Sequence, residues 1–192
     1  MKKSFVKALM LSAMVAVAGT PAAFAQEKPQ GQQTLVSMGS VSDKGKPIPV
    51  DPPKSGETNS APAPRAPAPP LTAMWVYAVG STNCGWEYTA GLTTTTCDHG
   101  GPELRTAVLE IGYGASRVAW MNSGLVPSGS MYASTPVCVT GGYYTWPCTA
   151  GQTVVGFLNE YNLDGNQSGL FKYQNTSSNS PFNTMSVQIN IL

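Results

Sequence analysis

Hydrophobic and polar residues alternate along the chain after residue 70 in a way that predicts β-strands. The clearest run lies at residues 185–191, where Met, Val and Ile alternate with Ser, Gln and Asn. Successive side chains of a strand point to opposite faces, so this run predicts a half-buried C-terminal strand. Similar patterns predict further strands at residues 71–79, 107–113, 117–121 and 155–161.

Gly, Asn, Ser and Pro separate these runs at short intervals, which is typical of an all-β domain. We therefore expect residues 71–192 to form a single antiparallel sandwich or barrel domain. A chain of about 120 residues can build one hydrophobic core but not two. One short helix around Pro102 to Leu109 is the alternative, because Pro-Glu-Leu-Arg can begin a helix as well as lead into a strand.

The N-terminal part of the chain has a different composition. Residues 1–25 combine early lysines, an apolar stretch from Ala8 to Gly19 and a small-residue cleavage pattern ending at Ala25, which predicts a cleaved signal peptide. Residues 26–70 hold ten of the sixteen prolines, which predicts a disordered linker rich in Pro and Ala. The apolar stretch is shorter than the ~20 residues of a membrane span, so we expect no stable membrane insertion after cleavage. A secreted or periplasmic protein is predicted.

Four cysteines follow the predicted signal peptide, at Cys84, Cys97, Cys138 and Cys148. An even number of thiols in an oxidising compartment is expected to pair. Pairing of Cys84 with Cys97 and of Cys138 with Cys148 places the smallest demand on the topology. A metal site is disfavoured because the chain lacks Cys-x-x-Cys and has a single histidine, so we expect no metal and no cofactor.

The predicted domain is slightly acidic. Residues 71–192 contain three basic side chains and six acidic ones. Because affinity for nucleic acid comes largely from clustered Lys and Arg, we expect no nucleic-acid partner.

His99 is the only histidine and lies in the turn Asp98-His99-Gly100-Gly101. An imidazole titrates near neutral pH, so any histidine-dependent acid-base chemistry must use it. Candidate catalytic residues are His99, Asp98 and Glu110, with Glu87 and Glu103 as other carboxylates that could approach the ring. A Gly-x-Ser-x-Gly elbow that would nominate a nucleophile is absent. The alternative is a structural histidine that hydrogen-bonds its own turn.

Residues 71–114 contain several short motifs: the strand Trp75-Val-Tyr77-Ala-Val, the element Gly85-Trp86-Glu87, the threonine-rich run before Asp98-His99-Gly-Gly, and Glu110-Ile-Gly-Tyr-Gly114. Together these motifs resemble those of the small secreted bacterial proteins grouped as YolA-like. The resemblance implies a secreted protein and brings no catalytic assignment with it.

The segment from Asn162 to Gly169 is rich in oxygen ligands but lacks the glycine and glutamate spacing of an EF-hand. Asp164-Gly165 is better explained as a hairpin turn between two aromatic-rich strands. A looser calcium site made of Asp164 and backbone carbonyls is the alternative.

Aromatic residues give the last functional signal. Tyr143, Tyr144 and Trp146 lie inside the second predicted disulfide loop, and Trp86 lies near the first. Tyr and Trp are frequent anchors of interfaces, so these four are candidate binding residues for a glycan, an envelope component or a protein partner. The alternative is that their rings cap the core.

Two functional hypotheses follow. The first is an exported binding or effector module that acts on an envelope or glycan component or on a protein partner. The second is a small secreted hydrolase or toxin that uses His99 with a nearby carboxylate.

Overall fold

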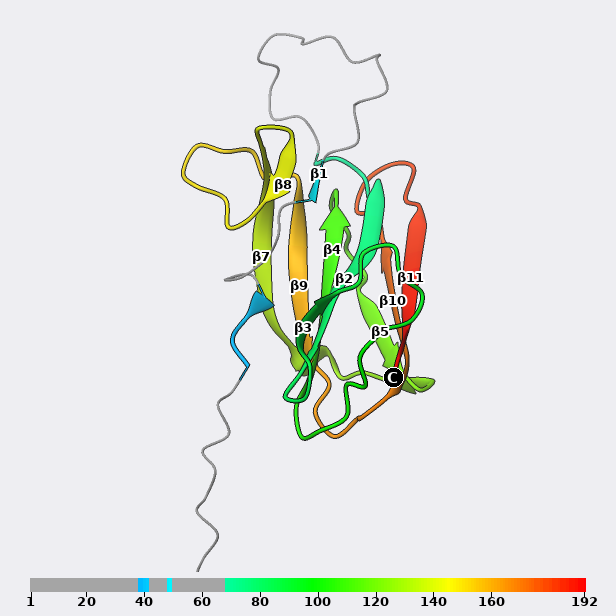
Figure 1. Ribbon diagram of the computed structural model, residues 1–192. Coiled ribbons are helices and arrows are strands. Elements are labelled where there is room, and N and C mark those ends of the chain that lie inside the picture. The colour runs from blue at the N-terminus through cyan, green and yellow to red at the C-terminus, as the bar shows by residue number, and fades with distance from the viewer. Residues whose placement is uncertain (1–37, 42–47, 50–67) are drawn as a thin grey trace, which may run out of the picture. The chain divides into compact units, whose positions relative to one another are not determined.

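The computed structural model describes residues 38–41, 48–49 and 68–192, and within them the chain is all-β (Figure 1). The strands are β1 (Ile48–Pro49), β2 (Ala73–Ser81), β3 (Gly85–Tyr88), β4 (Leu104–Ile111), β5 (Val118–Met121), β6 (Gly124–Leu125), β7 (Met131–Thr140), β8 (Tyr143–Thr145), β9 (Gly156–Asn162), β10 (Gly169–Thr176) and β11 (Thr184–Ile191), and a short 3-10 helix, η2, spans Ser128–Ser130. Every pairing between these strands is antiparallel. The predicted antiparallel all-β class is confirmed, and the predicted signal peptide lies outside the described residues.

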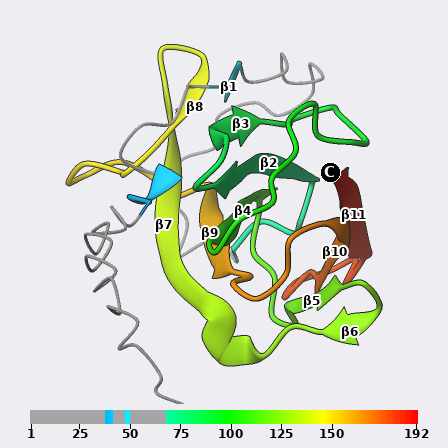
Figure 2. The ribbon, with the colours of Figure 1, turned by 60° about the horizontal axis from the view of Figure 1, so that its bottom comes forward.

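The strands form two sheets in a sandwich-like arrangement. The larger sheet has the order β1-β8-β7-β9-β4-β2-β3, and the smaller has the order β11-β10-β5-β6. Figures 1 and 2 show the smaller sheet facing the larger one, with β11 beside β2. Alternate residues of the facing strands fill the space between the sheets, among them Val76, Leu104, Val108, Phe171, Tyr173 and Ile189. The period of two that predicted the strands therefore builds the main core.

The opposite face of the larger sheet carries a second hydrophobic cluster. It is covered partly by residues that the sequence places in the linker: Val41 is fully buried there, and Ile48 packs against the same cluster. The Val41 N–H donates to Oε2 of Glu160 over 3.0 Å, and Nε1 of Trp86 donates to the Gly39 carbonyl over 3.0 Å. These described parts of the predicted linker thus belong to the folded unit.

Both predicted disulfides are present. Cys84 bonds to Cys97 and Cys138 bonds to Cys148, with Cα atoms 6.3 Å and 5.5 Å apart. The first bond holds the loop after β3 against the β2–β3 turn, and the second holds the segment after β8 against β7. Nearest-neighbour pairing is confirmed.

One alternative and one local prediction are wrong, whereas the strand predicted near residues 107–113 is confirmed. Residues Leu104–Ile111 form strand β4, so the short helix considered around Pro102 to Leu109 does not exist. The Asp164-Gly165 turn is not a hairpin, because β9 belongs to the larger sheet and β10 to the smaller one. The turn carries the chain from one sheet to the other, a connection that strand periodicity cannot distinguish from a hairpin.

Candidate functional site

A fully buried carboxylate, Glu110, lies between the two sheets. Its Oε1 accepts hydrogen bonds from the Tyr173 hydroxyl at 2.8 Å and from Nδ2 of Asn175 at 2.6 Å. Its Oε2 accepts from Nδ2 of Asn159 at 2.8 Å and from Nε of Arg117 at 3.3 Å. Four donors therefore converge on one carboxylate, an arrangement that matches the acceptor-only character of its ionised form.

Strand periodicity and one glycine bring these groups together. Glu110 shares the inward face of β4 with Leu104 and Val108, while Tyr173 and Asn175 share the inward face of β10. Gly114 lets the chain before β5 approach Asn175, because a Cβ at this glycine would lie 2.0 Å from Nδ2 of Asn175. Asn175 Oδ1 then accepts the Ser116 N–H at 3.0 Å. This contact fixes the backbone that places Arg117 over Glu110.

Burial and the charge of Glu110 shift the pKa values of the neighbouring side chains. Burial lowers the pKa of Arg117, but the charge of Glu110, its hydrogen bond to Arg117 and the two neighbouring tyrosines together outweigh burial and raise the pKa above its ordinary value. Burial raises the pKa of Tyr173, and the charge of Glu110 raises it further. Tyr161 hydrogen-bonds to Tyr173, and burial followed by the charge of Glu110 also raises the pKa of Tyr161. Both phenols are therefore neutral donors at physiological pH, and Arg117 is a permanent cation.

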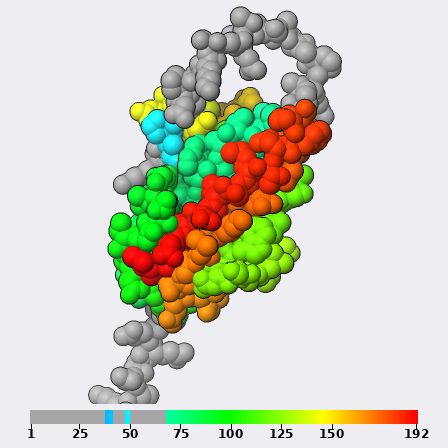
Figure 3. Space-filling model, turned by 90° about the vertical axis from the view of Figure 1, so that its right-hand side faces the viewer, coloured from blue at the N-terminus to red at the C-terminus, as the bar shows by residue number. Residues whose placement is uncertain are grey.

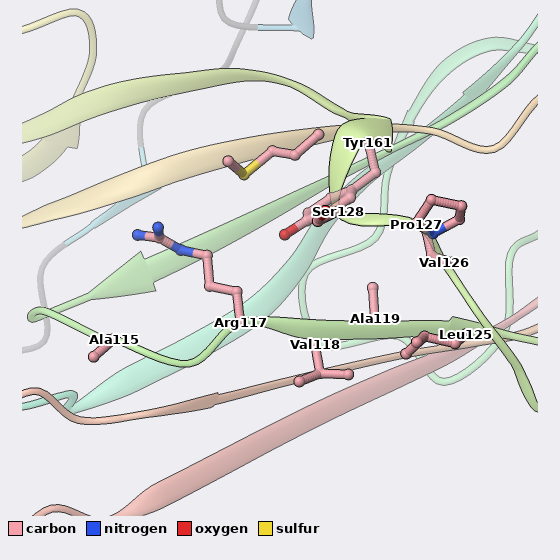
Figure 4. Close-up of a pocket in the computed structure, with 10 residues that line it drawn as sticks. Ala115, Arg117, Val118, Ala119, Leu125, Val126, Pro127, Ser128 and Tyr161 are labelled. Atoms are coloured by element: carbon pink, nitrogen blue, oxygen red, sulfur yellow. The ribbon is translucent and has the colours of Figure 1, made fainter.

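A pocket of about 410 Å³ opens beside this network (Figure 4). Its polar lining comes from Arg117, Tyr161 and Ser128, and its apolar lining from Val118, Ala119, Leu125, Val126, Pro127 and Met131. Arg117 projects from the start of β5, Tyr161 from β9 in the facing sheet, and Ser128 from η2. The Arg117 side chain is 29 % exposed, and among the described residues its only hydrogen-bonded nitrogen is Nε. The two terminal nitrogens are therefore available to a ligand.

A family model described as "Domain of unknown function (DUF4879)" matches residues 66–191, which is well over half of the chain. The chain belongs to the DUF4879 family. No curated protein matches it. The matched region contains the whole Glu110 network and every residue that lines the pocket.

His99 of the DUF4879 domain is fully buried and lies in a second polar cluster. Its Nδ1 lies 3.1 Å from the Ser81 hydroxyl, and its Nε2 lies 3.1 Å from Oε2 of Glu87. Glu87 also accepts the backbone N–H groups of Thr96 at 2.7 Å and Cys97 at 3.1 Å. Burial raises the pKa of Glu87, but these hydrogen bonds outweigh it and hold the pKa below its ordinary value. Serine, histidine and carboxylate are thus connected in a chain beside the first disulfide.

The three predicted catalytic residues do not meet. Asp98 is exposed and accepts the Gly100 N–H at 3.2 Å, so it caps its own turn and does not bond to the His99 ring. Glu110 pairs with Met74 in the strand register, whereas Ser81, the neighbour of His99, pairs with Leu104 at the other end of the same two strands. The carboxylate that contacts the His99 ring is Glu87, one of the three that the sequence left as alternatives.

Three of the four aromatic residues predicted to bind a partner are half-buried in the DUF4879 domain. Trp146 makes an edge-to-face contact with Tyr77, with ring centroids 5.1 Å apart, and Tyr144 and Trp86 pack against the second hydrophobic cluster. Tyr143 is 47 % exposed. The core-capping alternative therefore describes three of the four rings, and Tyr143 alone points to solvent among them.

The Asp164 carboxylate is occupied by contacts within the chain. It forms an ion pair with Arg105 and accepts the Leu104 N–H at 3.0 Å. Burial raises the pKa of Asp164, but the hydrogen bonds from Arg105 and Leu104, the charge of Arg105 and the contact with Asn162 together outweigh burial and lower the pKa. Within residues 38–41, 48–49 and 68–192, no cluster of three His, Cys, Asp or Glu side chains could hold a metal ion. The same residues include no helix long and apolar enough to cross a membrane.

Sequence reasoning missed Arg117, Tyr161 and Ser81. Arg117 carried one usable signal, because it is one of only three basic residues after residue 70. Nothing in the sequence pairs it with Glu110, since the two contact each other only after the chain has crossed from the larger sheet to the smaller one.

Proposed function

We propose that this protein is an exported binding module and that the pocket beside Arg117 is its ligand site. The observation that carries the proposal is the Arg117 guanidinium, which Glu110 holds at the wall of a 410 Å³ pocket with two terminal nitrogens unoccupied among the described residues. Pockets of about 300–1,000 Å³ with a few fixed polar groups and an apolar lining are typical of small-molecule sites.

The lining defines the chemistry of the ligand. A guanidinium binds planar anions such as carboxylates through parallel hydrogen bonds. Tyr161 and Ser128 add hydroxyl groups, and the remaining wall is apolar. The ligand is therefore a small molecule, or the end of a larger one, that joins an anionic group to an apolar part.

The structure contains a large rigid support for this guanidinium. A buried ion pair is weak evidence for stability, because removing two charges from water costs several kcal/mol. A network of two asparagines and a tyrosine around Glu110 is therefore better explained by the need to orient Arg117 than by stability alone. Exporting such a module to an oxidising compartment is supported by the two disulfides and by the predicted signal peptide.

A pair of small probes tests the proposal. Hexanoate and 1-hexanol share an apolar chain and differ in the anionic group, and their binding can be followed by ¹H–¹⁵N NMR titration. We expect hexanoate to shift the amide signals of Val118 and Ser128 and hexanol to bind at least tenfold more weakly. Losing a charge-assisted hydrogen bond costs about 1.5–3 kcal/mol, or roughly 10- to 100-fold in affinity, so Arg117→Met should weaken hexanoate by that factor.

Two further variants control for damage to the fold. Ser128→Trp fills the pocket from an exposed position and leaves the Glu110 network intact, so it should abolish binding while the protein stays folded. Arg105→Met removes another ion-paired arginine that does not line the pocket, and it should not change binding. Equal affinity for hexanoate and hexanol, or unchanged binding in Ser128→Trp, would refute the proposal.

A hydrolase is the second candidate, and the Ser81–His99–Glu87 chain supports it. The order of groups is that of a serine nucleophile, an imidazole base and an orienting carboxylate. Ser81 and His99 are both fully buried, however, and a nucleophile must be reached by its substrate. The structural alternative is therefore favoured, in which the cluster fastens the first disulfide loop to β2.

Variants of this cluster separate the two roles. A structural His99 predicts that His99→Ala lowers the melting temperature and leaves hexanoate binding unchanged at temperatures where the variant is folded. A catalytic role predicts that Ser81→Ala abolishes hydrolysis of p-nitrophenyl acetate without a change in fold. Wild-type turnover that survives in Ser81→Ala would remove the hydrolase hypothesis.

A further inference from the structure

The outward face of the smaller sheet is an uncovered polar surface with one aromatic corner. Figure 3 shows β11, β10 and the β5–β6 region adjoining one another at the surface of the molecule. The inward residues of β10 and β11 are buried or partly buried, and the outward ones are Thr, Ser, Gln and Asn on β11 and a mixture of Lys, Gln, Thr and Leu on β10. Trp120 of β5 lies on this same outward face, because it pairs with Lys172 in the strand register.

The aromatic corner forms a shallow hollow. Trp120, Ser123, Leu170 and Lys172 line a space of about 270 Å³. The ammonium group of Lys172 lies 5.5 Å from the centroid of the Trp120 ring, and Leu170 is 42 % exposed beside them. One ligand group of the size of a sugar ring can therefore touch an aromatic ring, an aliphatic side chain and a cation together.

The charge of this face is opposite to that of the rest of the domain. Lys172 is the only charged residue in β5, β6, β10 and β11, and the residues after position 70 carry six acidic and three basic side chains in all. The two arginines are paired with Asp164 and Glu110. Lys172 has no carboxylate partner among the described residues, so its ammonium group is available to an external anion on this face of the domain.

We propose that the Trp120–Lys172 face binds an acidic oligosaccharide. The C–H face of a pyranose ring packs against Trp120 and Leu170, and the carboxylate of a uronic acid pairs with the Lys172 ammonium. Gln188 lies opposite Lys172 on β11, and Gln174 lies two residues further along β10, so amide groups continue the surface away from the hollow. Their donors and acceptors suit the hydroxyl groups of neighbouring sugar residues. This inference is independent of the Arg117 pocket, whose lining shares none of these residues.

Isothermal titration of the full disulfide-bonded protein with tetragalacturonate tests this site. Maltotetraose has the same number of sugar rings without carboxylates, and a short linear polyphosphate has charge without rings. We expect tetragalacturonate to bind at least tenfold more tightly than either of the other two. Equal binding of polyphosphate would show that charge alone is recognised and would overturn the proposal, as would equal binding of maltotetraose.

Matched variants locate the binding surface. Trp120→Ala and Lys172→Met should each weaken tetragalacturonate at least tenfold, and Lys172→Arg should restore most of the affinity that Lys172→Met loses. Tyr143→Ala removes another exposed aromatic ring, which lies on β8 of the larger sheet, and should leave the affinity for tetragalacturonate unchanged. Loss of affinity in Tyr143→Ala with retention in Trp120→Ala would overturn the proposal and return glycan binding to the aromatic loop that the sequence predicts.

Trp120 is only partly buried, so we expect the Trp120→Ala variant to fold. Its fold can be measured separately from glycan binding. Far-ultraviolet circular dichroism and a cooperative thermal unfolding transition report on the fold of the variant without depending on the Arg117 pocket. A variant that keeps both and loses tetragalacturonate has lost the glycan surface alone. A variant that keeps both and still binds tetragalacturonate with wild-type affinity would overturn the role of Trp120.

Discussion

Replacing Glu110 with glutamine turns one oxygen of the buried carboxylate into an amide nitrogen and leaves the shape of the side chain almost unchanged. The carboxylate accepts four hydrogen bonds, two on each oxygen. The single carbonyl oxygen of glutamine can keep two of these donors. Its –NH₂ group then faces the other two donors, and Arg117 loses its counter-charge.

The structure sets the size of the effect. Each buried donor that loses its acceptor costs about 1–3 kcal/mol, so two of them cost roughly 2–6 kcal/mol. Breaking one side of a buried ion pair typically costs ~3–5 kcal/mol, which lies within the same range. We therefore expect Glu110→Gln to lower the free energy of unfolding by about 3–5 kcal/mol. For a domain of this size that corresponds to a decrease of roughly 10–20 °C in the melting temperature.

Urea denaturation followed by tryptophan fluorescence measures this change with the disulfides intact. Glu103→Gln is the matched control, because Glu103 is only partly buried and accepts one described hydrogen bond, from the Met38 N–H at 3.1 Å. It should cost less than about 1 kcal/mol. Tyr173→Phe removes one donor and leaves the carboxylate with three, so it should cost about 1.5–3 kcal/mol, the range for one hydrogen bond to a charged group. If Glu110→Gln lowers the free energy of unfolding by less than ~1 kcal/mol, or by the same amount as Glu103→Gln, the four hydrogen bonds to Glu110 do not stabilise the protein as proposed.

Three further changes test other parts of the structure. The pKa of Glu87 is lowered from its ordinary value of 4.5, so the stability that its carboxylate contributes is present above that pH and is lost as the pH falls through the folded-state pKa. In thermal melts from pH 7 to 3, the melting temperature of Glu87→Gln should therefore fall less than that of the wild type. Val41→Ala removes two buried methyl groups at ~0.8 kcal/mol each and should cost about 1.5 kcal/mol, whereas Val139→Ala, at a position 44 % exposed, should cost far less; equal losses would place Val41 outside the core. Gly112 has φ +96°, and a Cβ there would lie 2.0 Å from a backbone carbonyl oxygen, whereas Gly141 has φ +58° and open space around it. Gly112→Ala should therefore lower the free energy of unfolding by about 1–3 kcal/mol more than Gly141→Ala. Equal losses in chemical denaturation would contradict the close approach of the backbone at Gly112.

The strands were predictable from sequence where one face of the strand is buried and the other is polar. Residues 185–191 show that alternation and form β11. β9 was predicted from the spacing of its aromatic residues instead, since nearly all of its residues are buried on both faces. Strand β7 was missed because its exposed Tyr132, partly buried Pro136 and buried Val137 follow no period of two. Leu104–Ile111 is almost wholly buried on both faces, so its polarity cannot separate strand from helix.

The candidate sites were less predictable than the fold. Glu110 and His99 were recognised as chemically important residues, but their partners come from other strands and, for Glu110, from the other sheet. The rings of Tyr144 and Trp146 were expected at a surface because the loop is short and closed by a disulfide. They are half-buried because they pack against the second hydrophobic face of the larger sheet, which no local pattern reveals.

The sequence by itself determined the strand periodicity, the pairing of the cysteines and the acidic character of the domain, because each of these depends on residues near one another or on composition. Only the tertiary structure decided which side of each strand meets which partner. Arg117 and Glu110 lie seven positions apart in the chain and form an ion pair across two sheets, while Trp120 and Lys172 meet because β5 and β10 are neighbours. Side-chain contacts of this kind follow from sheet order, and sheet order is set by long-range packing of the whole core.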